Sequence, residues 1–181
     1  PLFAVVAEKI YQKEPSAEAA YGLAMMFFSK QDFAKFEQYL KEAIDKCDDP
    51  KAKADYNYKL AQVNLSKKNY QQARRYALEA LKTNPNLGSA YITIGLAYAV
   101  SSNDYEGDEF DKRTVFWAAV DKFVKAKQVD PSVAATANEY IERYSPHFPT
   151  KDEAFFRSIT AGKNVKVGGW INETTTARFR D

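Results

Sequence analysis

The residues of this chain that could do chemistry are few and far apart in the sequence. Cys47 is the only cysteine and His147 the only histidine. A thiol and an imidazole act as nucleophile and base only when folding brings them within hydrogen-bond reach, so a hydrolase would require these two side chains to meet in one pocket. Cys47 also falls at a predicted helix end, where a structural thiol is common. Neither a glycine-rich phosphate loop nor a Ser-His-Asp triad can be assembled. We therefore expect no enzymatic activity and no cofactor.

The acidic segment 101–113 is the place where a metal ion could be considered. Asp104, Glu106 and Asp108 alternate as calcium ligands do, but the glycine of the turn stands at 107 and no glutamate occupies the twelfth position of the loop. A single cysteine also rules out a multi-cysteine zinc site. We predict a solvated loop and no metal.

Charge and composition argue against several classes of partner. Lys and Arg number 26 against 24 Asp and Glu, and the formal net charge of +2 provides no strong field for nucleic acid. A basic spot at 67–68 and 74–75 is diluted by Glu79 and is interpreted as a solvated face. No apolar run approaches the roughly 20 residues that a bilayer crossing needs. A single cysteine leaves the compartment open, because exported proteins often lack disulfides.

A pattern of small and aromatic residues recurs along most of the chain. It is clearest as Leu60-Ala61, Tyr70-Gln71-Gln72-Ala73, Ala80 and Pro85. Related patterns begin at Leu23-Ala24 and at Ile94-Gly95. Small residues at this spacing suit two short antiparallel helices that pack closely and are then stopped by proline. The third unit carries an insertion at 101–113. The pattern therefore predicts a helical repeat.

The apolar periodicity and the stop signals predict the individual elements. Helices are expected at 1–14, 17–29, 32–46, 51–67, 70–83, 87–100, 114–128, 132–144 and 151–161. Ser16 is the predicted N-cap of the second helix, and 150–153 is a predicted capping box. Gly162 is expected to end the last helix in a left-handed turn. Strand-forming residues from 165 to 179 predict a small hairpin that turns at 172–173, with an extended tail as the alternative.

The recurring pattern resembles the tetratricopeptide repeat (TPR), whose period is about 34 residues. The resemblance implies an all-α, right-handed α-solenoid over 1–144. It would consist of a half repeat at 1–16, repeats at 17–50, 51–87 and 88–131, and a capping helix at 132–144, followed by a tail at 145–181. In this family the first helix of each pair lines a concave face that holds another polypeptide.

Carried over by position, the resemblance implies a groove whose lining is mainly aromatic and aliphatic. Its expected partner-binding residues are Tyr21, Met25, Phe28, Asp55, Tyr58, Lys59, Gln62, Leu65, Ile92 and Leu96. Family members that clamp a peptide carboxylate need several basic residues here. This chain offers only Lys59, because Gly22 and Thr93 occupy the matching positions, so a carboxylate clamp is rejected. Tyr21, Met25 and Tyr58 could instead simply pack between helices.

The tail carries a concentration of aromatic and aliphatic residues outside the repeats: Phe155, Phe156, Trp170, Ile171 and Phe179. Because burying this much apolar area would contribute several kcal/mol, we expect residues 145–181 to fold onto the repeats. They would either cover the open end of the last repeat or occupy the concave groove.

The later part of the chain also resembles a group of bacterial TPR proteins from Bacteroidetes that has no assigned activity. The resemblance is carried by 108–121, Tyr144-Ser145-Pro146-His147-Phe148-Pro149 and Gly168-Gly169-Trp170-Ile171-Asn172-Glu173-Thr174. It implies an exported, envelope-associated protein. The chain begins without methionine, and helix 1–14 looks like the second half of a repeat, so we expect further sequence upstream.

Two functions follow as expectations. The first is a non-catalytic scaffold that binds a peptide or protein segment through the apolar groove. The second is an assembly subunit of a larger complex, in which the open N-terminal edge stacks on other copies or partners and the tail occupies the groove. Both expectations involve protein partners and neither involves nucleic acid.

Overall fold

The computed structural model describes residues 2–180. Pro1, the first residue of the predicted helix 1–14, and Asp181, the last residue of the predicted tail 145–181, lie outside the described residues. The described chain is mostly helical, with one small antiparallel sheet. The helices are α1 (Leu2–Lys13), α2 (Ala17–Ser29), α3 (Phe33–Lys46), α4 (Pro50–Ser66), α5 (Tyr70–Thr83), α6 (Gly88–Val100), α7 (Glu109–Val129), α8 (Ala134–Tyr144) and α9 (Lys151–Phe155). The strands are β1 (Asn164–Val167) and β2 (Glu173–Thr176). No helix within 2–180 combines the length and apolarity that a bilayer crossing requires.

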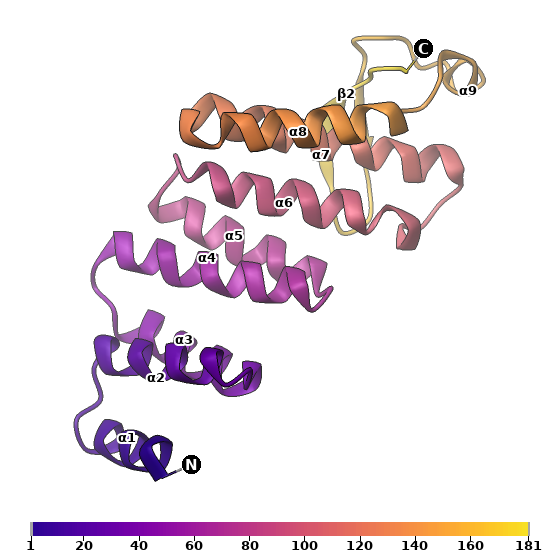
Figure 1. The fold of residues 1–181 in the computed structure, drawn as a ribbon. Coiled ribbons are helices and arrows are strands. Elements are labelled where there is room, and N and C mark those ends of the chain that lie inside the picture. The colour runs from indigo at the N-terminus through magenta and orange to yellow at the C-terminus, as the bar shows by residue number, and fades with distance from the viewer. Residues whose placement is uncertain (1, 181) are drawn as a thin grey trace.

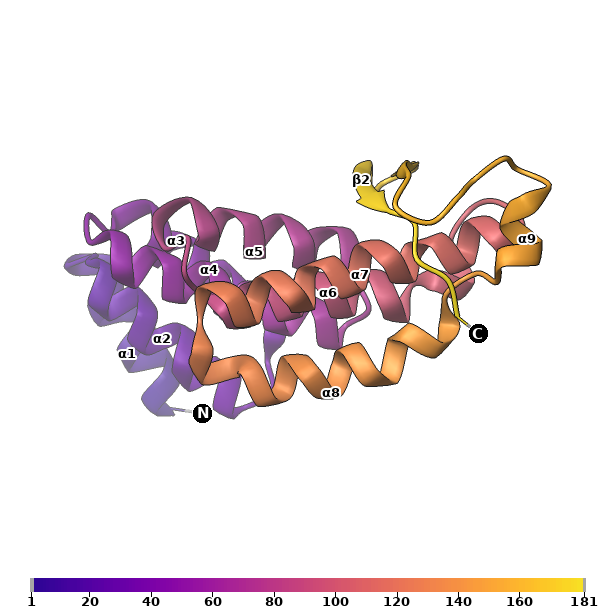
Figure 2. The ribbon, with the colours of Figure 1, turned by 90° about the horizontal axis from the view of Figure 1, so that it is seen from above.

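The helices from α2 to α7 pack as successive antiparallel pairs, α2 with α3, α4 with α5 and α6 with α7. Figure 1 shows the pairs following one another from the N-terminal to the C-terminal end. Figure 2 shows α3, α5 and α7 along one side of the molecule, with α8 on the other side. The bounds of α2 to α6 agree with the predicted segments to within a residue or two, and Ser16 caps α2 by accepting from the Ala19 backbone N–H.

In each of the first two pairs, the same kind of tight turn connects the two helices. Gln31 and Lys68 adopt left-handed backbone angles, with φ of 60° and 61°. The next residue in each turn donates back across the helix end, from the Asp32 N–H to the Phe27 carbonyl at 3.0 Å and from the Asn69 N–H to the Asn64 carbonyl at 2.8 Å. This is the Schellman motif, which satisfies carbonyls that the helix end leaves free. The two pairs therefore share their connection as well as their sequence pattern.

Small residues allow the paired helices to approach closely, as the pattern predicts. Ala24, Ala61 and Ala73 are fully buried. At the matching place in α6, Gly95 lies so close to α7 that an added Cβ would stand 2.6 Å from Phe123 Cε1 and 2.9 Å from the Ala119 carbonyl oxygen. Larger side chains at these positions would separate the helices.

The insertion is more ordered than the predicted solvated loop at 101–113. It contains a short 3-10 turn, η1 (Ser102–Asp104), and α7 begins at Glu109, earlier than the predicted 114. The helix extends backward because Asp108 and Asp111 form a capping box at its start. Tyr105 and Phe110 are both buried, so aromatic packing holds the insertion against the helices.

The tail also departs from the prediction in its details. The capping box of Thr150 and Glu153 is present, but α9 ends at Phe155 instead of 161, because Ser158 takes the left-handed turn that was assigned to Gly162. Gly162 has a positive φ of 81° in the loop that follows. The hairpin is confirmed, with Val167 opposite Glu173. Its turn therefore spans 168–172, and the predicted turn at 172–173 is wrong.

The hairpin is attached to the helices through Glu173. One oxygen of this carboxylate accepts from the Tyr98 hydroxyl at 2.6 Å and pairs with Arg74 at 3.2 Å, and the other pairs with Lys122 at 2.6 Å. Burial acts to raise the pKa of Glu173, but the bonds from Lys122 and Tyr98 outweigh it, so the pKa is lowered. Because these partners come from α5, α6 and α7, one tail residue joins three helices.

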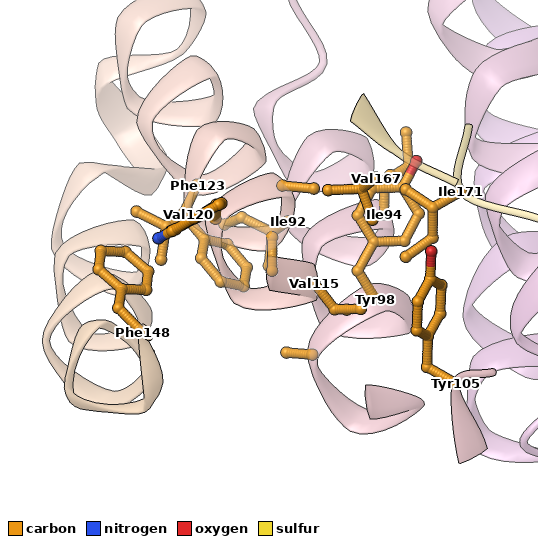
Figure 3. Packing of buried hydrophobic residues seen from close by; sticks show 14 of the residues in the cluster. Ile92, Ile94, Tyr98, Tyr105, Val115, Val120, Phe123, Phe148, Val167 and Ile171 are labelled. Atoms are coloured by element: carbon orange, nitrogen blue, oxygen red, sulfur yellow. The ribbon is translucent and has the colours of Figure 1, made fainter. Parts of the chain in front are cut away.

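Both halves of the tail contribute to the hydrophobic core: Phe148 and Ala154 in the first half, and Val167, Ile171 and Ala177 in the second. Figure 3 shows Val167 and Ile171 of the hairpin packed with Ile94 and Tyr98 of α6. Trp170 and Phe179 are half-buried. Phe155 and Phe156 are 77% and 88% exposed, so the expectation that they are buried is wrong. Phe155 is the last residue of α9 and Phe156 follows it, and both side chains face solvent.

The tail lies on the layer that contains α5 and α7. The strands contact α7, and Figure 2 shows β2 on the side of α5 and α7, opposite α8. Contacts from Arg178 to Asp121, at 2.7 Å, and to the Trp117 carbonyl extend the attachment along α7. The hairpin and the residues that follow it therefore cover part of the face that α5 and α7 form.

The same substitution at two glycines tests the close approach of the helices. We expect Gly95→Ala to destabilise the protein by about 1–3 kcal/mol, because the new methyl group overlaps Phe123 and backbone of α7. Gly22→Ala meets nothing within 4 Å, so it should stabilise α2 by up to about 1 kcal/mol through helix propensity. Urea unfolding of both variants measures the difference. If both substitutions changed the unfolding free energy equally, the close packing of Gly95 against α7 would be contradicted.

Removing the charge of Glu173 tests the attachment of the tail. We expect Glu173→Gln to cost about 1–3 kcal/mol at pH 7, because Arg74 and Lys122 lose a half-buried charged partner. The pKa of Glu173 is lowered in the folded chain from its ordinary 4.5. Its contribution is therefore complete above that value and is lost as the pH falls through the folded pKa.

The measurement is the difference in unfolding free energy between wild type and Glu173→Gln at several pH values. Glu79→Gln is the matched control, since Glu79 pairs with Lys82 on an exposed helix face and should contribute little. A Glu173 effect as small as that of Glu79, or one that grows below pH 4, would contradict the attachment.

Candidate functional site

An apolar hollow of about 310 Å³ lies between the first two helix pairs. It is lined by Met25, Phe28, Phe33, Phe36, Lys59, Gln62, Val63 and Ser66. The Phe28 ring packs against Phe36 with 5.2 Å between ring centres. Phe36 is only 1% exposed, whereas Phe28 is 43% exposed. The Phe28 ring therefore offers apolar surface to solvent beside a fixed aromatic wall.

A second hollow of about 450 Å³ adjoins the first and shares Lys59 and Gln62 with it. Its other lining residues are Tyr21, Ala52, Asp55, Tyr56 and Tyr58. Tyr21 stacks on Tyr56 at 4.7 Å, which joins α2 to α4 at the base of this hollow. Burial raises the pKa of Tyr56, so its hydroxyl stays neutral at physiological pH. We call the two hollows together the α2–α4 groove.

The polar groups of the groove are available to a ligand. Gln62 donates to the Tyr58 hydroxyl at 3.1 Å. Among residues 2–180, neither Lys59 nor Asp55 forms a salt bridge, although ion pairs occur nearby on α3. The groove thus combines an apolar floor with one cation and one anion on α4.

Seven of the ten predicted partner-binding residues line this groove. They are Tyr21, Met25, Phe28, Asp55, Tyr58, Lys59 and Gln62. The other three do not line it. Leu65 is half-buried, Leu96 packs beside the core of α6 and α7, and Ile92 is only 9% exposed within that core. Contact between α4 and α6 leaves Ile92 among buried side chains, so the groove stops at α4.

Sequence reasoning missed the contribution of α3 to the groove. Phe33 and Phe36 belong to the apolar stripe of that helix, which normally signals core packing. Both also line the hollow, Phe36 as its buried wall and Phe33 as a half-buried ring that α2 and α4 leave partly uncovered. The periodicity of one helix carries no information about how closely its neighbours approach.

The residues considered for catalysis lie in separate environments. Cys47 is buried after α3, where its thiol donates to the Asp49 carbonyl at 3.5 Å. The His147 ring stacks on Phe116 at 4.9 Å, beyond the end of α8. The structure therefore does not bring the two side chains together. No group of three or more His, Cys, Asp and Glu that could hold a metal ion occurs in the described part of the chain.

Comparison of the chain with protein-family models and with curated proteins finds no match in either case.

Replacing Phe28 and Phe36 separately with alanine distinguishes a side chain that serves binding from one that the fold requires. We expect Phe36→Ala to cost about 3–5 kcal/mol, because it removes a fully buried ring. Phe28→Ala should cost about 1 kcal/mol or less, since much of this ring already faces solvent. Denaturant unfolding measures the unfolding free energy of both variants, and the values are comparable when the dependence on denaturant concentration (the m value) equals that of the wild type. A Phe28 cost that equals the Phe36 cost would mean that Phe28 serves the core.

Proposed function

We propose that this chain is a TPR-like α-solenoid that acts as a non-catalytic scaffold and holds a peptide or protein segment in the α2–α4 groove. The repeated helix pairs, their shared turn and their small interface residues support the solenoid. The exposed apolar surface between α2 and α4 supports the binding role, and it is the observation that carries the proposal.

The groove fits a segment with one bulky apolar side chain. Such a side chain, placed against Phe28 and Phe36, would gain about 1.5–3 kcal/mol on burial. Lys59 and Gln62 lie at the point shared by both hollows. Their side chains could donate hydrogen bonds to a carboxylate or a backbone carbonyl of the ligand, beside its apolar side chain. Asp55, on the same helix, could accept a hydrogen bond from an N–H group of the ligand. The expected ligand is therefore amphipathic and uncharged at its anchor.

The position of the tail is consistent with an open groove. The residues that line the two hollows all come from α2, α3 and α4, and none from 145–180. Within the described residues the tail is attached to α5, α6 and α7 instead, so the expectation that it occupies the groove is wrong. A partner would not need to displace it.

A displayed peptide library provides the direct test. We expect peptides selected on the wild-type chain to share a bulky apolar residue. Phe28→Asp should weaken them at least about tenfold, because a charge replaces the apolar wall of the anchor site. Fluorescence anisotropy with synthetic peptides measures the dissociation constants. Ile10→Asp is the matched control, since Ile10 is exposed on α1, away from the groove lining.

Selected peptides that bind Phe28→Asp as tightly as wild type would contradict the proposal, and so would peptides without a preferred apolar residue. The assembly alternative is favoured by a different observation: Val5, Val6 and Ile10 expose apolar surface on α1. In that case Ile10→Asp would abolish self-association in sedimentation, and Phe28→Asp would leave it unchanged.

A further inference from the structure

A hollow of about 520 Å³ lies between the start of α5, the insertion and the hairpin turn. Tyr70 contributes to it from α5, Tyr105 from the insertion and Trp170 from the hairpin turn. The insertion and the tail are the two segments that depart from the repeat pattern, and here they meet. The hollow shares no lining residue with the α2–α4 groove.

Packing holds two of its aromatic rings in place. The Trp170 ring meets Tyr98 edge to face with 5.4 Å between ring centres, and the Trp170 carbonyl accepts from Arg74. Tyr105 is 9% exposed and lies against the hairpin turn, where a Cβ added to Gly169 would stand 3.5 Å from its ring. Figure 3 shows Tyr105 beside Ile171 of that turn. Both rings therefore line the hollow in fixed positions, and Trp170 is the more exposed of the two.

Two carboxylates of the hollow have no charged or hydrogen-bonded partner among the residues that the structure describes. Asp104 and Glu106 form no salt bridge or side-chain hydrogen bond among residues 2–180, whereas Asp108 and Asp111, farther along the insertion, both pair with Arg157. Asp104 and Glu106 line the same hollow as Tyr105. Burial, with the negative charges of Asp111 and Glu106, raises the pKa of Tyr105. Lys68 is the one basic residue in the lining.

We propose that this hollow binds an organic cation, an alkylammonium or guanidinium group, against the rings of Trp170 and Tyr105 and beside the carboxylates of Asp104 and Glu106. The face of an aromatic ring is electronegative and attracts such cations, most strongly at tryptophan. Two unpaired carboxylates outweigh Lys68, so they favour a cation over an anion. A lysine or arginine side chain of a protein and a free quaternary amine share this chemistry.

Matched small probes test the charge requirement. Choline and its neutral isostere 3,3-dimethylbutan-1-ol have nearly the same shape and differ in charge. We expect choline to quench or shift Trp170 fluorescence saturably, with the alcohol binding at least about tenfold more weakly. Trp117, the other tryptophan, is fully buried and should respond little. An acetylated, amidated tetralysine peptide forms the second arm. Tighter binding of the peptide than of choline assigns a protein side chain, and the reverse assigns a free amine.

Variants then locate the site. The double substitution Asp104→Asn with Glu106→Gln should weaken choline and peptide about tenfold without lowering the thermal midpoint, because both residues are exposed. Lys68→Glu should tighten both probes. Asp152→Asn, which neutralises an exposed carboxylate outside the hollow, should change neither.

Three results would overturn the proposal: no saturable response to choline or the peptide, equal binding of choline and the alcohol, or unchanged affinity in the double variant. Phe28→Asp separates this site from the α2–α4 groove. It should leave choline binding intact even if it abolishes binding of the selected apolar peptides, so each proposal can fail without the other.

Discussion

Close contact between paired helices is the constraint on which this structure depends. Alanine and glycine at the crossing points bring the backbones together, and the larger side chains must then lie to either side of the crossing. In the pair of α6 and α7, Gly95 accepts the Phe123 ring, and the core there is continuous. Between α2 and α4, the stacked rings of Tyr21 and Tyr56 bridge the pairs instead. Both rings line the α2–α4 groove.

The two non-repeated segments are stable because they support each other on the helices. A two-stranded hairpin is marginal alone in water, but here Val167 and Ile171 enter the core and Glu173 joins three helices. Tyr105 of the insertion packs under the same hairpin turn. Burial also raises the pKa of Tyr98, and its hydroxyl donates to Glu173. This arrangement fixes the tail on α5 and α7 and leaves α2 and α4 uncovered.

The α2–α4 groove and the hollow between α5, the insertion and the hairpin turn differ in chemistry because different parts of the chain build them. The groove is made within the repeats, from the apolar stripes of α2 and α3 and the partly polar face of α4. The hollow is made where the insertion and the hairpin turn meet the start of α5, and it contains unpaired carboxylates. A segment with an apolar anchor and a separate cation would thus be recognised by different forces in two separate hollows, whose linings come near each other at Ser66 and Lys68.

The sequence by itself determined helices α2 to α6 and their pairing, and the repeat resemblance supplied seven of the groove residues. Helix periodicity, caps such as Ser16 and small residues such as Ala61 and Gly95 are local signals that act over a few turns. The tertiary structure alone decided that Ile92 is buried, that Phe33 lines the groove, and that Phe155 and Phe156 face solvent. It also decided that Asp104, Tyr105 and Trp170 share one hollow. Those outcomes depend on how closely separate elements approach, and that distance is fixed by packing across the whole chain.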